Sequence, residues 1–214
     1  TFVLLNRSRD CCVGDIDVPY AIFAILGLAF WQIFSAGIIA CTNSVTSAGG
    51  MIAKINFPRE ALVFASIGQA LIAFLIQIVV VIGLFVYYGF TPHWMILLMP
   101  LAFIPVVLLT LGLGLIFSIV NGIMRDLGKI IGILMSFLLF LTPVMYTKPQ
   151  YGLLGLITKY NPLYYLTSGP RDLALNGSLS EPVGYFYSVF LAIVLFFLCW
   201  MVFHLTETRI SERI

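Results

Sequence analysis

The sequence predicts an all-α, polytopic membrane protein. Its 214 residues are 61% hydrophobic and only 9% charged, with a mean hydropathy of +1.08, whereas soluble domains carry roughly 25% charged residues. No charged residue occurs from Val18 to Ala53 or from Ala61 to Pro92. Because a helix of about 20 apolar residues crosses a bilayer core, each of these runs can span a membrane. We therefore expect a single transmembrane domain, residues 1–214.

The first two predicted spans cover about residues 19–44 and 60–88. Pro19 suits the start of a helix. In the second span, small and polar residues recur at four-residue steps and share one face: Ala61, Ala65, Gln69, Ala73 and Gln77. In hydrocarbon such a face must be covered, either by another helix or by a polar pathway. The residues alone leave both alternatives open.

Three further spans are predicted at about 94–122, 128–145 and 183–205. The third carries a face of small residues that permits close helix approach. A short charged interruption makes the third and fourth spans an antiparallel pair, and Pro143 breaks or kinks the far end of the fourth. The fifth span leads into a charged tail.

A polar stretch separates the first two spans. Between residues 49 and 59, apolar residues alternate with Lys54, Asn56 and Arg59, and Pro58 closes the run. This pattern favours a short amphipathic helix that lies along the membrane surface. Its basic residues favour the cytoplasmic side. The pattern is typical both of an ordinary surface turn and of a docking element for a soluble partner.

The segment from about 148 to 180 differs from the spans. Its apolar pieces are too short to cross a bilayer, and Gly, Pro and Asn residues separate them. Short re-entrant or interfacial helices fit this pattern, because irregular backbone at membrane depth must be buried in protein or line a cavity. An ordinary folded outer loop is the alternative.

Several kinds of chemistry are missing from the 214 residues. There is no Gly-x-x-x-x-Gly-Lys-Ser/Thr loop for ATP phosphates, no catalytic or zinc-binding motif, and no basic cluster for nucleic acid. We therefore expect no catalytic residue, no metal site, no cofactor on this chain and no nucleic-acid partner. The first four spans also lack the deep ionisable residues that a proton-coupled carrier needs.

Aromatic residues are abundant, at 14% of the chain. Aromatic rings offer sugar rings a flat apolar surface on which to stack. The candidates for an aromatic belt that lines a substrate channel are Trp31, Phe34, Phe137, Phe140 and Tyr146. For each ring, packing against lipid or a neighbouring helix is the ordinary alternative.

Three motifs resemble one known family. Lys54-Ile-Asn-Phe-Pro-Arg-Glu60 resembles the Lys-x-x-Phe-Pro-Arg-Glu signature of the membrane subunits of type-2 ABC exporters of polysaccharides, the permeases for O-antigen, teichoic acid and capsule. Arg125-Asp126, followed by a span that ends in Thr142-Pro-Val-Met-Tyr146, resembles a second family pattern. Asn161-Pro162 with Arg171 resembles a third. The resemblance covers most of the chain.

The resemblance implies roles for particular residues. It implies a coupling helix at about 49–59 that docks on an ATPase, with contacts from Met51, Lys54, Phe57, Pro58, Arg59, Glu60, Arg125 and Asp126. It also implies two short re-entrant helices that gate the outer mouth, with Pro143, Tyr151, Asn161, Pro162 and Arg171 at the gate.

The resemblance further implies an assembly. Two copies of the chain would form a homodimeric channel, and two copies of a separate nucleotide-binding ATPase would bind ATP and Mg. The substrate would be a lipid-linked polysaccharide such as O-antigen, moved across the bacterial inner membrane among membrane lipids. Family members carry an amphipathic helix and one more span before this point, so we expect both to be missing here.

Two other functions remain open from the sequence. An ABC permease for a drug or small lipid shares the Arg-Asp and Asn-Pro…Arg patterns but fits Lys54–Glu60 less well. A membrane-embedded enzyme or scaffold without an ATPase is the second alternative. Purification with a nucleotide-binding partner distinguishes the exporter from the latter.

Overall fold

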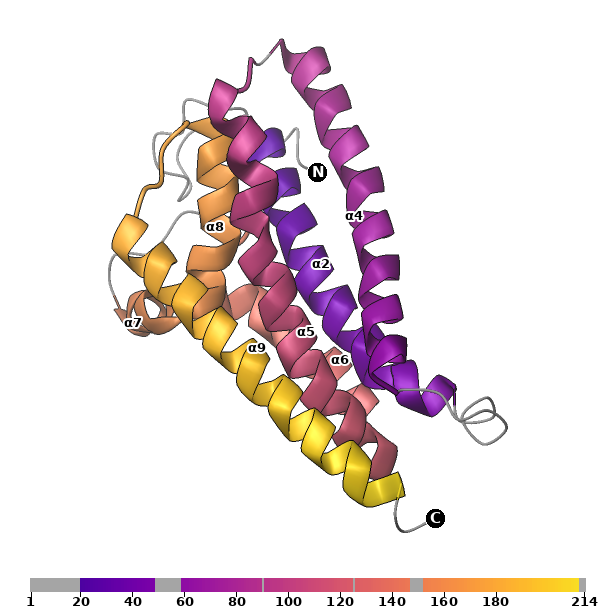
Figure 1. Cartoon of the computed structure of the whole chain (residues 1–214). Helices are drawn as coiled ribbons and strands as arrows, with labels where there is room; N and C mark the ends of the chain where they lie inside the picture. The colour runs from indigo at the N-terminus through magenta and orange to yellow at the C-terminus, as the bar shows by residue number, and fades with distance from the viewer. Residues whose placement is uncertain (1–19, 49–58, 90, 125, 147–151, 212–214) are drawn as a thin grey trace.

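The computed structural model describes residues 20–48, 59–89, 91–124, 126–146 and 152–211. Within these ranges the chain is a bundle of helices without strands (Figure 1). The elements in chain order are α2 (Tyr20–Ser47), α4 (Arg59–Tyr88), the 3-10 helix η1 (Trp94–Leu98), α5 (Met99–Ile123), α6 (Leu127–Leu141), α7 (Gly152–Tyr160), α8 (Pro162–Leu175) and α9 (Pro182–Ser211). By length and composition, α2, α4, η1 with α5, and α9 can each cross a membrane. The predicted all-α, polytopic fold is confirmed.

The fourth predicted span is shorter than expected. The sequence placed it at about 128–145, but α6 ends at Leu141. Pro143 explains this end, because the residue before a proline is driven out of helical backbone geometry. Thr142 indeed has φ −97° and ψ 122°, an extended conformation. Residues 142–146 then form a turn. With its 15 residues, α6 is too short to count among the helices that can span a membrane.

Helix α2 is the centre of the bundle. It packs most extensively against α4 and α5, and it also contacts α6 and α8. Three rings join the central helices: Phe74 and Phe103 are stacked with centroids 4.5 Å apart, and Phe30 lies within 5.7 Å of both. Small residues bring the backbones close, since a Cβ added at Gly114 would lie 2.6 Å from Cys41 Cβ. Such close approach is how helices associate where lipid competes with side chains for apolar contacts.

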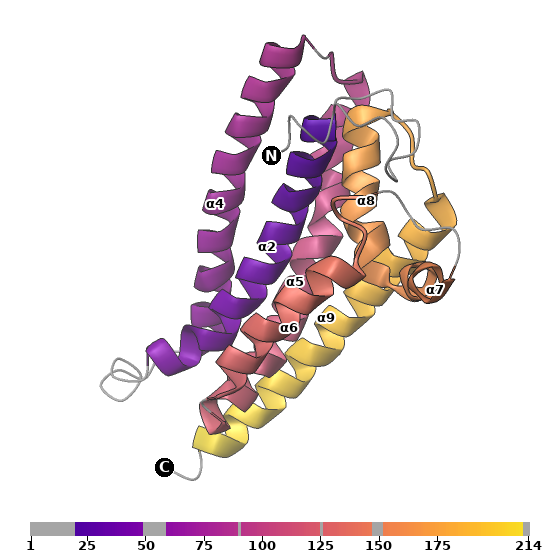
Figure 2. The same ribbon diagram turned by 180° about the vertical axis from the view of Figure 1, so that it is seen from behind.

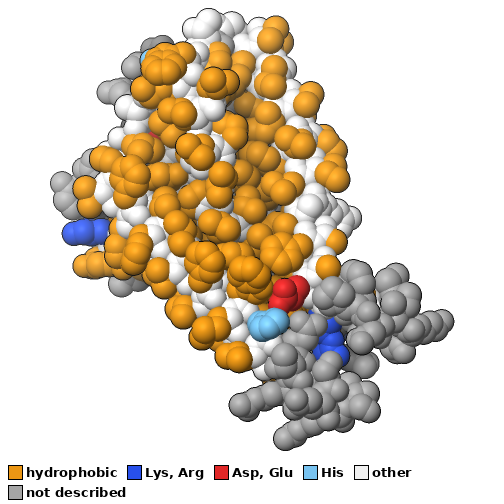
Figure 3. Space-filling model, in the orientation of Figure 1, with side chains coloured by type: hydrophobic (Ala, Val, Ile, Leu, Met, Phe, Trp, Pro, Cys, Tyr) orange, Lys and Arg blue, Asp and Glu red, His pale blue; other side chains and the backbone are white. Residues whose placement is uncertain are grey.

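The outer surface of the bundle is largely apolar. Figure 3 shows hydrophobic side chains over most of one face, with acidic and histidine side chains near its lower end. Many exposed large hydrophobic residues lie on α4, α6 and α9, and include Ile72, Leu75, Ile76, Val79, Val86, Ile130, Ile133, Leu134, Phe137, Phe140, Val183, Phe186, Tyr187 and Phe190. A soluble protein rarely exposes so much contiguous apolar surface, whereas a bilayer accepts it. The chain is a multi-pass membrane protein.

Two short helices occupy the segment predicted to be re-entrant. Helix α7 lies across the bundle, and α8 runs from α7 back toward the end where α4 meets η1 (Figures 1 and 2). Helix α8 packs against α5, α9, η1 and α2. Its backbone is therefore covered by protein, as irregular segments at membrane depth require.

The contact between α2 and α5 yields a prediction. Gly114→Val places two methyl groups against Cys41, and we expect overpacking to lower the free energy of unfolding by about 1–3 kcal/mol. Gly68→Val is the matched control, because no atom lies within 4 Å of a Cβ added at Gly68. The measurement is the fraction of each variant that stays monodisperse on size-exclusion chromatography after heating in detergent. Equal stability of the two variants would contradict the close contact.

Candidate functional site

Several helix ends gather at one end of the bundle, which we call the coupling end. There α2 ends at Ser47, α4 begins at Arg59, α5 turns into α6, and α9 runs toward the C-terminus (Figures 1 and 2). The predicted coupling helix, at about 49–59, connects α2 with α4, and the Arg-Asp motif lies in the α5–α6 turn. Both segments predicted to contact an ATPase are therefore attached at this end.

Most of the predicted coupling residues lie outside the described residues: Met51, Lys54, Phe57, Pro58 and Arg125. Arg59 and Glu60 form the first turn of α4, and Asp126 is the N-cap residue of α6. Asp126 pairs with Lys129 at 3.4 Å, and both side chains are more than four-fifths exposed, at 84% and 83%. An exposed pair of this kind adds little stability and leaves Asp126 accessible. The coupling role of these residues stays a prediction.

Glu60 connects the start of α4 to α9. Trp200 Nε1 donates a hydrogen bond to Glu60 Oε2 at 3.3 Å, and His204 Nδ1 lies 3.3 Å from Glu60 Oε1. Trp200 and His204 were not predicted from the sequence as partners of Glu60. Their positions in the sequence could have suggested this contact. Antiparallel spans bring the polar residues near their ends to the same membrane depth, and Glu60 begins one span while Trp200 and His204 lie near the end of another.

A cavity of about 430 Å³ lies beside this contact. Helices α2, α4, α5 and α9 all contribute to its wall, which is formed by Val45, Arg59, Ser118, Ile119, Gly122, Ile123 and Phe203. The wall is mainly apolar, with the Arg59 guanidinium as its charged group. Four helices that meet around a cavity can shift relative to one another more readily than helices in a filled core.

Asn121 is a further residue of the coupling end, and the sequence did not predict it. It lies in the last turn of α5, is only 1% exposed, and contacts both α2 and α6. The sequence does show a polar amide at the end of an apolar run, close to the Arg-Asp motif, and this position could have marked Asn121 as a candidate. The identity of its partners, however, depends on the fold.

The outer segment, residues 142–146 and 152–181, is held together by two polar side chains. Asn161 caps α8 by accepting a hydrogen bond from Leu163 N at 3.0 Å, and its Nδ2 donates to Thr142 Oγ1 at 2.9 Å. Pro162 follows as the first residue of α8, where a proline is favoured. Asn161 thus links the start of α8 to the turn after α6.

Arg171 holds the same turn from the other side. Its Nη1 donates to Val144 O at 3.1 Å, and its Cζ lies 3.9 Å from the centre of the Phe23 ring. Asp172 Oδ1 is 3.9 Å from Arg171 Nε, so its charge also stabilises the guanidinium. A buried cation is costly unless such partners surround it. Gly27 is required here, since a Cβ at this position would lie 2.5 Å from Val144 O.

The structure brings three of the predicted gate residues around one turn. Pro143 is buried within residues 142–146, while Asn161 and Arg171 bond to this turn. Pro162 directly follows Asn161, and Tyr151 lies outside the described residues. The gating role itself stays a prediction.

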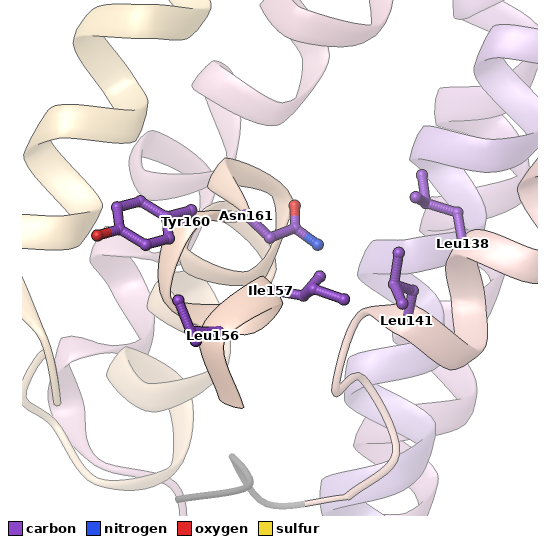
Figure 4. Close-up of a pocket in the computed structure, with 6 residues that line it drawn as sticks. All are labelled: Leu138, Leu141, Leu156, Ile157, Tyr160 and Asn161. Carbon is purple, nitrogen blue, oxygen red and sulfur yellow. The ribbon is translucent and has the colours of Figure 1, made fainter. Parts of the chain in front are cut away.

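A groove of about 460 Å³ separates α6 from α7. Figure 4 shows Leu138 and Leu141 of α6 on one side, with Ile157 and Asn161 directed toward them from the other. Leu156 and Tyr160 of α7 complete the wall. The groove is apolar apart from the Asn161 amide and the Tyr160 hydroxyl, so it suits hydrocarbon better than a free sugar.

The five residues of the predicted aromatic belt do not share one surface. Trp31 and Phe34 are buried in the core, at 4% and 1% exposure, because α2 is surrounded by other helices. Phe137 and Phe140 are exposed on α6. Tyr146 is half-buried, and its hydroxyl donates to Phe140 O at 2.8 Å. A lining role for any of these rings stays a prediction.

Metal-binding clusters are not found in the described part of the chain, where no group of three or more His, Cys, Asp or Glu side chains could hold an ion. Cys41 and Cys199 are buried there as free thiols.

Comparisons with known proteins agree with one another. The family described as "ABC-2 type transporter" matches residues 13–175. A Klebsiella pneumoniae protein named "O-antigen export system permease protein RfbA" is 30% identical over 191 residues, which cover 85% of this chain and 73% of that protein. A second Klebsiella pneumoniae protein of the same name is 30% identical over 174 residues, 78% of this chain and 66% of that protein. A Myxococcus xanthus protein of that name is 25% identical over 202 residues, 92% and 76% of the two chains.

The contacts of Arg171 yield a prediction. Arg171→Ala removes the charged donor to Val144 O, and we expect the free energy of unfolding to fall by about 1.5–3 kcal/mol. Lys159→Ala is the control, because the Lys159 side chain is exposed. Thermal unfolding in detergent measures both variants. If Arg171→Ala unfolds at the control's temperature, the guanidinium does not hold the turn.

Proposed function

The chain belongs to the ABC-2 type transporter family, and we propose that it is the channel-forming membrane subunit of an ATP-driven exporter of a lipid-linked, O-antigen-like polysaccharide. The observation that carries this proposal is the 30% identity, over 85% of the chain, to a protein named as an O-antigen export permease. The Lys54–Glu60 motif, which favours polysaccharide exporters over drug permeases, supports the same substrate class.

In this proposal the energy comes from a second protein. The 214 residues carry no phosphate-binding loop, so ATP and Mg would bind to a separate ATPase. Two copies of the chain would form the channel around a two-fold axis, and two ATPases would dock on them. The assembly would lie in the bacterial inner membrane, where lipid-linked polymers meet cytoplasmic ATP.

The coupling end supports this mechanism. Both segments predicted to touch the ATPase are attached there, and Asp126 is exposed. Through Glu60, a displacement of the first turn of α4 would pull directly on Trp200 and His204 of α9. The cavity between α2, α4, α5 and α9 offers these helices room to move.

The outer segment supports a gate. The turn after α6 is bonded to α8 at two places, through Asn161 and Arg171. A displacement of α8 would therefore carry this turn with it, and the groove between α6 and α7 would change shape. We propose that this unit opens and closes the outer mouth of the channel for the polymer.

The exporter proposal predicts a defined assembly. The native protein, purified in detergent together with the ATPase encoded beside it, should form a complex of two membrane subunits and two ATPases that hydrolyses ATP. In vesicles, that complex should move a lipid-linked polysaccharide across the bilayer when ATP is added. Mass photometry gives the composition, and protection of the polymer from an added glycosidase gives transport. A chain that binds no ATPase, or that moves only small lipids, would contradict the proposal.

The docking role of Arg59 yields a separate prediction. Reversing its charge with Arg59→Glu should weaken association with the ATPase on the order of tenfold, because a mismatched charge at an interface opposes binding. Lys159→Glu, an equivalent reversal on α7, serves as the control. The ATPase retained per membrane subunit during purification, and polymer export, are measured for both. Full association and export by Arg59→Glu would show that this residue is not part of the docking surface.

A further inference from the structure

Asn121 is a fully buried amide at the point where three helices meet at the coupling end. Its Nδ2 lies 3.0 Å from Thr42 O, 3.3 Å from Asn43 Oδ1 and 3.3 Å from Thr46 Oγ1, all on the last turns of α2. The acceptors are themselves fixed, since Asn43 Nδ2 donates to Ile39 O and Thr46 Oγ1 donates to Asn43 O. The amide NH₂ group of Asn121 therefore faces α2.

The amide oxygen of Asn121 faces the other way. Gly128 N, in the first turn of α6, donates to Asn121 Oδ1 at 2.9 Å. Helix starts need such acceptors because their first N–H groups have no partner within the helix. Asp126, the N-cap residue, makes no side-chain cap bond, so α5 supplies a cap for α6. Gly128 is needed for this approach, because a Cβ there would lie 2.5 Å from Asn43 Oδ1.

From this geometry, and resting on the function proposed above, we propose that Asn121 is a positioning residue that joins the end of α2 to the α5–α6 turn. The predicted coupling helix leaves α2 two residues beyond Ser47, and the Arg-Asp motif lies between α5 and α6. Asn121 thus makes the two predicted docking segments move as one body. Force from the ATPase reaches α2, the centre of the bundle, whichever segment receives it.

The link that Asn121 forms between α2 and α6 resists separation of the two helices. Separating α2 from α6 would leave a buried amide without partners, which is unfavourable away from water. The same amide cannot bond to both helices if either one moves independently. Two segments joined by a contact of this kind therefore shift together.

Two sets of variants separate a coupling role from a stabilising one. Asn121→Leu keeps the number and branching of the side-chain heavy atoms and removes all four hydrogen bonds. The double variant Asn43→Ala/Thr46→Val removes two acceptors on α2 and leaves the cap of α6 intact. Asn43 and Thr46 are exposed, so this double variant tests the link even if Asn121→Leu does not fold. Ser47→Ala is the matched control, because the Ser47 hydroxyl donates to Asn43 O and Ser44 O within α2 itself.

The readout is the amount of polymer exported per ATP hydrolysed by the purified complex in vesicles. We expect this ratio to fall on the order of tenfold in Asn121→Leu, within the usual range for coupling between two sites, with a smaller fall in Asn43→Ala/Thr46→Val. ATP hydrolysis should stay within about twofold of the unmodified complex, since the ATPase itself is unchanged. Ser47→Ala should keep the ratio.

The outcomes distinguish this inference from the proposed function. If the unmodified complex exports no polymer, the proposed function fails. If it exports polymer but both sets of variants keep the ratio, even with a lowered melting temperature, Asn121 only stabilises the bundle and the inference is wrong. Hydrogen exchange adds a direct check of the geometry: the Gly128 amide should exchange faster in Asn121→Leu and not in Asn43→Ala/Thr46→Val.

Discussion

Close approach of other chain segments to α2 is the constraint on which the rest of the molecule depends. Lipid tails are as apolar as leucine, so helices in a bilayer gain little from hydrophobic burial and depend on close packing instead. Along α2, the side chain of Thr110 reaches Gly37, Gly114 of α5 reaches Cys41, and the backbone of Val144 reaches Gly27. One helix is thereby in contact with the outer segment at one end and with the coupling end at the other.

The two ends of the bundle use polar contacts differently. At the outer segment, α6 ends just before Pro143, and the turn that follows is held by side chains. Asn161 donates a hydrogen bond to the Thr142 hydroxyl, and Arg171 donates one to the Val144 carbonyl. At the coupling end, Glu60 and Asn121 connect the beginnings and ends of separate helices. Between the ends many contacts are apolar, as in the rings of Phe30, Phe74 and Phe103, while Tyr185 OH donates to Ala102 O at 2.7 Å and joins α9 to α5. Movement at one end can therefore reach the other through the packed helices.

Much of this architecture could be predicted from the sequence, because apolar run length and proline position are local properties. The four long helices and the paired helices α7 and α8 follow from them. The contacts of Asn121 could not be predicted, since its partner Thr42 is 79 residues away in sequence. Nor could the burial of Trp31 and Phe34, because helical spacing identifies a shared face but not the neighbour that covers it. For the predicted outer gate, the motif identified Asn161 and Arg171, and only the fold revealed that both bond to the turn at residues 142–146.

The shortness of α6 has a consequence for the surrounding lipid. With 15 residues, its axis is about 22 Å long, whereas a hydrocarbon core is about 30 Å thick. Helix α4, with 30 residues, has no such deficit. Where the exposed apolar side of α6 meets lipid, hydrophobic mismatch draws the two leaflets toward each other. We therefore expect the bilayer to be thinner beside α6 than beside α4, which shortens the apolar path for a polar group that crosses there.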